Sequence, residues 1–137
     1  MKLICSIQSN FKELPKLTES IRESCRRYNY DDGFQNDIRL VLEEIVVNII
    51  KHGYNDCADQ SIDLEIEFNS SEWKMTVEDQ GIPFNPLNFR RVNINHSLQD
   101  MHIGGQGIHL VKQISKSIEY NRLANNKNRL TVILGAQ

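Results

Sequence analysis

Two runs of strictly alternating residues, 62–68 and 73–78, constrain the fold of this chain more than any other feature. In each run every second side chain is apolar, and the side chains between are charged or polar. A period of two indicates a strand with one face on a core and the other in water. The polar residues 69–72 between the runs predict a turn, so the two runs predict an antiparallel hairpin.

Helical and strand periods continue on both sides of this hairpin. The Asp-Asp-Gly run at 31–33 predicts the end of a first helix, and Asn36 or Asp37 can cap a second. Residues 3–7 predict a strand that is buried mostly on both faces. Helices before and between antiparallel strands indicate an α+β two-layer sandwich, in which a mixed, mostly antiparallel sheet is covered by helices on one face. The other predicted elements are helices over 14–28, 36–53 and from Gly104, and strands over 117–123 and 128–135.

Length and composition limit the number of domains and the class of protein. The 137 residues suit a single domain over 1–137. A net charge of -2 argues against direct binding to nucleic acid. The chain has no apolar run of about 18 residues and its start lacks a signal-peptide core, so we expect neither a membrane span nor export. Cys5, Cys25 and Cys57 lack metal or disulfide spacing, which favours reduced thiols in a cytoplasmic protein.

Four polar residues interrupt a helical segment, 41–54, that is otherwise made for burial. They share one stripe of the helix, at the spacing i, i+4, i+7 and i+8: Glu44, Asn48, Lys51 and His52. A carboxylate and an amide in apolar surroundings need a partner from protein, water or ligand. The adjacent Glu43 is turned by about 100° around the helix and can point to water.

An acidic residue lies at the end of the second alternating run. Continued alternation places Asp79 on the apolar face, where a carboxylate is costly without a partner. Gly81 follows and lets another group approach closely. Asp79 can therefore read a ligand, or it can cap the turn through the amide of Gly81.

Three glycines, Gly104, Gly105 and Gly107, precede and enter the last predicted helix. Free amides and the positive end of a helix can hold phosphate. The run does not follow a strand and lacks the Lys-Ser/Thr of a P-loop, so it is weak evidence by itself.

The three segments together resemble a known family. They read E-x-x-x-N-x-x-K-H on a helix, D-x-G-x-P-F after a strand, and G-G-x-G-x-x-L-V opening a helix. This order is similar to the N, G1 and G2 boxes of the Bergerat-fold ATP-binding domains shared by gyrase, histidine kinases and bacterial anti-sigma-factor kinases. The length, the Pro-Phe pair and the closing strand N-R-L-T-V-I-L look most like the anti-sigma-factor serine/threonine kinases.

The resemblance implies a role for each residue of the helical stripe. Glu44 matches the family's general base, and Asn48 matches the residue whose amide oxygen binds the Mg²⁺ ion that bridges the phosphates. Lys51 matches a basic residue near the phosphates, and His52 orients its neighbours or binds the sugar-phosphate side. For Lys51 and His52 a solvated helix end remains the alternative.

The resemblance also assigns the other two segments. Asp79 matches the aspartate that accepts a hydrogen bond from the adenine amine, and Gly81 leaves room for the base. Phe84 begins a lid over the phosphates that runs to Ile103. The β- and γ-phosphates would be held by the amides of the glycine run: Gly104, Gly105 and Gly107.

By resemblance, the chain binds ATP and Mg²⁺ and is a serine/threonine kinase that acts as an anti-sigma factor. Its substrate would be an anti-anti-sigma protein of the STAS type and its other partner a sigma factor, often with the kinase as a homodimer. Phosphoryl transfer needs mainly positioning, charge neutralisation and a base.

One departure from the family favours an alternative function, and a third reading is open beside it. Some anti-sigma kinases carry an arginine in or just before the glycine run, where this chain has His102 and Gln106. This weakens the expected contact with the γ-phosphate and favours a non-catalytic ATP-binding module that sequesters a partner. A histidine-kinase-type ATPase domain is the third reading.

Overall fold

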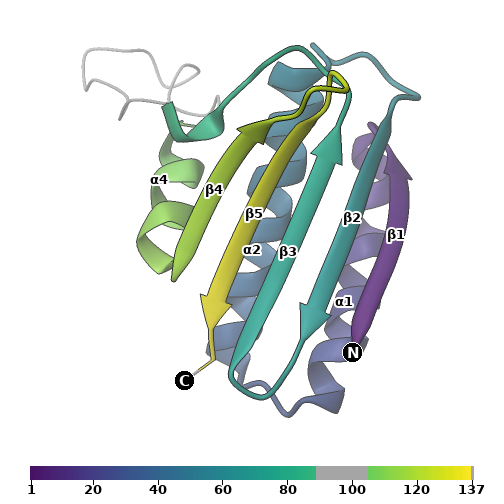
Figure 1. The fold of residues 1–137 in the computed structure, drawn as a ribbon. Coiled ribbons are helices and arrows are strands. Elements are labelled where there is room, and N and C mark those ends of the chain that lie inside the picture. Colours follow the sequence, from purple (N-terminus) through teal and green to yellow (C-terminus); the bar gives the residue numbers. More distant parts are fainter. Residues whose placement is uncertain (89–104, 137) are drawn as a thin grey trace.

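The computed structural model describes residues 1–88 and 105–136. In this part of the chain one sheet is covered by helices on one face, which confirms the predicted α+β two-layer architecture (Figure 1). The strands are β1 (Lys2–Gln8), β2 (Ser61–Phe68), β3 (Glu72–Asp79), β4 (Ser117–Arg122) and β5 (Asn128–Gly135). Their order is β1-β2-β3-β5-β4. Every pairing between these strands is antiparallel. The sequence predicts a mixed, mostly antiparallel sheet, so the mixed part of that prediction is wrong for the described strands.

Three α-helices in the described residues form the covering layer. They are α1 (Leu14–Arg27), α2 (Asp32–Asn48) and α4 (Gly105–Ile114). α1 and α2 lie side by side across the sheet, and α4 packs on the other side of α2 (Figure 1). The short turns are η1 (Phe11–Glu13), η2 (Ile49–Gly53) and η3 (Pro86–Asn88). No helix within the described residues has both the length and the hydrophobicity needed to cross a membrane.

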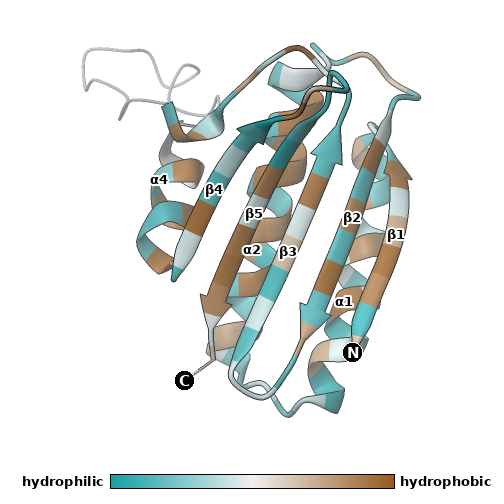
Figure 2. Ribbon diagram, viewed as in Figure 1, coloured by the Kyte–Doolittle hydropathy of each residue, from teal (hydrophilic) through white to brown (hydrophobic). Residues whose placement is uncertain are grey.

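One apolar core lies between the sheet and the helices. Figure 2 shows hydrophobic and hydrophilic residues alternating along the central strands, as the sequence predicts. Trp73 and Met75 of β3 have no exposed surface, and neither do Val41, Leu42 and Val46 of α2. Full burial of one such side chain contributes roughly 1.5–3 kcal/mol relative to an exposed one.

The start of α2 differs from the sequence prediction. The side chain of Asp31 caps the helix by accepting a hydrogen bond from the amide of Phe34 at 2.7 Å. The run at 31–33 therefore opens α2 instead of closing α1, and the predicted caps at 36–37 lie inside the helix. The chain reverses earlier, at Asn29, whose φ of 54° is the left-handed conformation at which many helices end.

β1 is an edge strand, and the prediction that it is buried on both faces is wrong. Its side chains alternate between exposed and partly buried, and Ile4 is 74% exposed. The helices cover only the opposite face of the sheet (Figure 1), so an apolar residue on the outer face of β1 stays in water.

α2 continues into η2, a π-helical turn that ends at Gly53, the predicted end of this helix. The amide of Tyr54 donates to the carbonyl of Ile49, five residues back, at 2.9 Å. Such wide turns are frequent at functional sites. In the loop after β3, the amide of Ile82 donates to the Gly53 carbonyl at 3.0 Å. This contact joins the end of the helix layer to the end of the sheet.

Candidate functional site

The ends of α2, β3 and β5 meet around a small cavity of about 20 Å³. This volume suits about one water molecule, so side chains of the protein nearly fill the site. The lining residues come from these three elements, from β4, from η2 and from the segment after β3. The polar and aromatic ones are Asn48, Asp79, Phe84, Tyr120 and Asn128.

Asn48 has a buried oxygen that receives no hydrogen bond from the described part of the chain. The residue is 2% exposed, and its Nδ2 donates to the carbonyl of Glu44 at 2.8 Å. Its Oδ1 has no partner among the described residues. An unpaired buried carbonyl costs roughly 1–3 kcal/mol, which a ligand at this atom would offset. A neutral amide oxygen suits Mg²⁺, which keeps water and phosphate oxygens as its other ligands, so Oδ1 fits the expected metal contact.

Glu44 lies one helical turn before Asn48 and contacts the first turn of α4. A Cβ placed on Gly107 would lie 1.8 Å from Oε2 of Glu44, so a side chain at 107 would displace this carboxylate. Burial raises the pKa of Glu44, the charge of Glu43 raises it further, and Lys51 lowers it. A carboxylate with a raised pKa is a better proton acceptor near neutral pH. The structure thus brings Glu44, Asn48 and Gly107 together.

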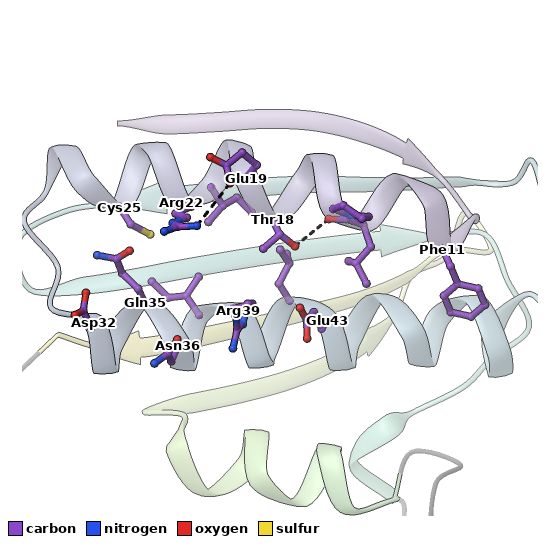
Figure 3. A pocket seen from close by; sticks show the side chains of 15 residues that line it. Phe11, Thr18, Glu19, Arg22, Cys25, Asp32, Gln35, Asn36, Arg39 and Glu43 are labelled. Carbon is purple, nitrogen blue, oxygen red and sulfur yellow. Dashed lines mark hydrogen bonds and ion pairs between the residues drawn. The ribbon is translucent and has the colours of Figure 1, made fainter.

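The adjacent Glu43 faces a different part of the molecule. It lines a groove of about 800 Å³ between α1 and α2, together with Glu19, Arg22 and Arg39 (Figure 3). This groove shares no lining residue with the small cavity. The two glutamates therefore face different surroundings: Glu43 faces the groove between α1 and α2, and Glu44 faces the first turn of α4.

Asp79 is the last residue of β3 and lies on the buried face of the strand, as the alternation predicts. It is 6% exposed. Its Oδ1 accepts hydrogen bonds from the amide of Gly81 and from Nδ2 of Asn128, both at 2.9 Å. No donor within the described residues bonds to Oδ2. Burial raises the pKa of Asp79, whereas the bonds from Asn128 and Gly81 and the charge of Arg122 lower it. The turn cap that the sequence allows is present, and it leaves the second carboxylate oxygen for a ligand.

Gly81 is needed where two segments of the protein meet. A Cβ at this position would lie 2.4 Å from the carbonyl oxygen of Gly53 and 2.9 Å from Oδ1 of Asp79. The end of η2 therefore lies directly against Gly81 on the side where a Cβ would be. Glycine permits this close approach because it has no side chain.

The remaining residues of the helical stripe border the site. The ring of His52 stacks on that of Phe84, with the centroids 5.1 Å apart and the planes at 20°. Phe84 lines the cavity, so His52 supports one of its walls. Lys51 is half-buried and close enough to Glu44 to lower the pKa of that carboxyl.

Part of the glycine run lies within the described chain. Gly105 is the first residue of α4, and Gly107 belongs to its first turn. Gly104, His102 and the predicted lid beyond Asn88 lie outside the described residues.

Sequence reasoning missed the residues that β4 and β5 contribute. Tyr120 and Asn128 line the cavity, and Arg122 donates to the carbonyl of Gly81 at 3.1 Å. The available signal was the alternation of the last strand, in which Asn128 takes an inner position in line with Leu130. A polar residue in an otherwise apolar row indicates a partner across the sheet.

The fold and this site define a class of nucleotide-binding domain. Residues 7–134 match the family of the Histidine kinase-like ATPase domain. Because this match covers nearly the whole chain, the chain belongs to that family. Membership implies that the domain binds ATP.

Two of the similar proteins are anti-sigma F factors. The chain is 23% identical to the one from Clostridium beijerinckii over 97 residues, which are 71% of this chain and 68% of that protein. It is 29% identical to the one from Clostridium perfringens over 98 residues, which are 72% of this chain and 68% of that protein.

The fold is similar to that in the crystal structure of the RsbU and RsbW domains of Rv1364c from Mycobacterium tuberculosis. The TM-score is 0.63, and the likeness covers 99% of this chain. This chain spans only 32% of that longer one, and the sequences are 16% identical. At this identity the likeness concerns the fold alone.

Proposed function

We propose that the domain binds ATP together with Mg²⁺ and transfers the γ-phosphoryl group to a serine or threonine of a partner protein. Asn48 carries this proposal, because its Oδ1 is buried, unpaired within the described residues and beside a cavity that Asp79 also lines. In a packed core an unpaired amide oxygen is unfavourable, whereas in a magnesium–nucleotide site such an oxygen can bind the metal ion. We further propose that residues 1–137 form a single domain.

Residues of three elements, β3, α2 and α4, would each bind a different part of the nucleotide. Asp79 would accept a hydrogen bond from the adenine amine through Oδ2. Asn48 would hold the Mg²⁺ ion, which neutralises charge on the phosphates when it is bound. The amides of Gly105 and Gly107 would hold the β- and γ-phosphates at the positive end of α4.

Glu44 acts as the general base. The hydroxyl oxygen of the partner's serine or threonine forms a bond to the γ-phosphorus, and the bond from that phosphorus to the bridging oxygen breaks. ADP leaves with the bonding electron pair, and Glu44 takes the hydroxyl proton. Burial favours this role because it raises the pKa of Glu44.

We propose two protein partners, a STAS-type anti-anti-sigma protein as substrate and a sigma factor as second ligand. The similar proteins are named anti-sigma F factors, which supports a sigma factor as partner. Nucleotide state and phosphorylation would then bias which partner is held, since linked equilibria act in both directions. The kinase would work in the cytoplasm as a homodimer that regulates transcription.

A second candidate is a non-catalytic ATP-binding module that sequesters its partner. The small cavity favours it, because a nucleotide has to displace Phe84 or its neighbours before the base can enter. A site that has to open before each nucleotide enters suits a sequestering module better than a kinase with rapid turnover.

Phosphate transfer separates the two candidates. The protein is incubated with γ-labelled ATP, Mg²⁺ and a STAS protein encoded near its gene, and ATP binding is measured by calorimetry in parallel. We expect label on the STAS protein and none on a STAS variant whose serines and threonines are replaced by alanine. ATP binding without transfer would support the sequestering module, and absence of ATP binding would contradict both candidates.

A further inference from the structure

Asn128 lies where the strand that carries Asp79 meets the β4–β5 hairpin. It is the first residue of β5, and its backbone pairs with Asp79 of β3 on one side and with Arg122 of β4 on the other. The residue is 4% exposed. Its side chain is therefore enclosed between the carboxylate proposed to read the base and the adjoining hairpin.

Both ends of the Asn128 side chain are engaged. Its Nδ2 donates to Oδ1 of Asp79 at 2.9 Å and to the carbonyl of Ile82 at 3.0 Å. Its Oδ1 accepts hydrogen bonds from the hydroxyl of Tyr120 and from the guanidinium of Arg122, the latter at 3.2 Å. The acceptors lie beside Nδ2 of Asn128 and the donors lie beside its Oδ1. If the amide were flipped, its oxygen would face the acceptor oxygens of Asp79 and Ile82. Tyr120 and Arg122 thus fix which end of the amide faces Asp79.

This arrangement fixes Asp79 in turn. Two donors, from Gly81 and Asn128, hold its Oδ1. Its Oδ2 has no donor among the described residues, and Asp79 lines the cavity. The charged or titratable groups around this carboxylate are Arg122 on β4, Tyr120 on β4 and Tyr54 after η2. Arg122 is the cation among them, and it favours the ionised carboxylate.

We infer that Asn128 is a positioning residue for nucleotide selectivity: its oriented amide holds Asp79 as a fixed hydrogen-bond acceptor for the amine of adenine. The inference rests on the proposed binding of ATP. Guanine carries a carbonyl where adenine carries the amine. A fixed acceptor at Asp79 therefore places its carboxylate oxygen against the guanine carbonyl oxygen, with no proton between them to form a hydrogen bond. A carboxyl group that binds a proton can donate to that carbonyl, and discrimination is lost.

Asn128→Asp tests the inference at nearly constant side-chain volume. The substitution removes the donor and places a second carboxyl against Asp79, so that the two groups share a proton. We expect ATP affinity to fall about 10-fold to 100-fold and GTP affinity to change by less than about threefold. The ratio of the two affinities, measured by calorimetry, is the readout, because a general loss of structure would lower both.

Two further variants complete the test. Tyr120→Phe removes only the hydroxyl that orients Asn128, and we expect it to reduce the ATP/GTP ratio less than Asn128→Asp does. Asn121→Ala, on the exposed side of β4, is the matched control and should leave the ratio unchanged.

The outcomes separate this inference from the proposed function. Equal losses of ATP and GTP affinity in Asn128→Asp would overturn the inference and leave ATP binding by the wild type intact. A wild type that binds no ATP would overturn both. If Asn128→Asp does not fold, as judged by circular dichroism, Tyr120→Phe decides, and a wild-type ratio in that variant overturns the inference.

Discussion

Asn48 keeps an amide oxygen buried without a donor among the described residues, and this is unfavourable for folding. Asn48→Leu replaces the amide by an apolar group of similar size on the same helix. We expect the ligand-free unfolding free energy to stay within about 1 kcal/mol of wild type or to rise, because leucine removes the unpaired oxygen and favours the helix. Urea denaturation measures this energy.

The same variant should lose the dependence of ATP affinity on magnesium. Titrations with ATP in the presence of Mg²⁺ or of a chelator make the comparison, with wild type as reference. If Mg²⁺ tightens ATP binding in Asn48→Leu as much as in wild type, Asn48 does not contact the metal.

Glu44 and Glu43 are adjacent in the sequence but face different surroundings, which allows a matched test. Glu44→Gln keeps the shape of the side chain but cannot take a proton, so we expect phosphate transfer to fall about 10²–10⁴-fold. ATP affinity should hardly change, because the base acts on the incoming hydroxyl. Glu43→Gln should retain a transfer rate close to that of wild type. Equal rates in the two variants would reject Glu44 as the base.

Asp79 destabilises the ligand-free protein when it is ionised. Its folded pKa is raised by burial, so its stabilising contribution is complete below the unfolded pKa and is lost as pH rises through the folded pKa. Asp79→Asn keeps an acceptor for Gly81 and Asn128 but carries no charge. We expect it to be more stable than wild type at neutral pH, with a gain that shrinks toward about pH 4.

Urea denaturation of both proteins at several pH values, without nucleotide, measures this gain. The same substitution should weaken ATP binding by about 1–3 kcal/mol, because the base loses a charged acceptor. A gain in stability that grows on acidification would contradict the assignment.

Among the elements, α4 approaches Glu44 closely at Gly107. A Cβ on Gly107 would overlap the Glu44 carboxylate, so Gly107→Ala must move that side chain. We expect phosphate transfer to fall at least about tenfold, while the intrinsic preference of alanine for helices limits the loss of stability to about 1 kcal/mol or less. Gly135→Ala is the control, since its Cβ would lie 4.0 Å from the nearest atom, on Lys116. A transfer rate in Gly107→Ala equal to that of the control would show that Glu44 tolerates displacement.

Element boundaries were predicted less well than element types. The hairpin, the two long helices and the closing strands follow from hydrophobic periods, which report burial directly. The start of α2 was placed four or more residues late because several Asp and Asn side chains between 31 and 37 can all act as caps. Which of them does so depends on where α1 ends, and a local pattern does not contain that information.

For the whole molecule, the arrangement of the strands determines how much of the site the sequence could reveal. Glu44, Asn48 and Asp79 break local patterns, so each is visible as an anomaly in its own segment. Asn128 becomes part of the site only through the pairing of β5 with β3, which joins residues 49 positions apart. A local reading of the chain does not show that the two strands are neighbours.

The bond between Asp79 and Asn128 also sets the order in which the site can be completed during synthesis. Asp79 leaves the ribosome well before Asn128, and until β5 has paired, the carboxylate lacks the amide that holds it. A nascent chain that ends before Asn128 contains Glu44, Asn48 and Asp79 but not their final arrangement. If Asn128 positions Asp79 as we infer, discrimination between purine bases would arise only when the last strand closes the sheet.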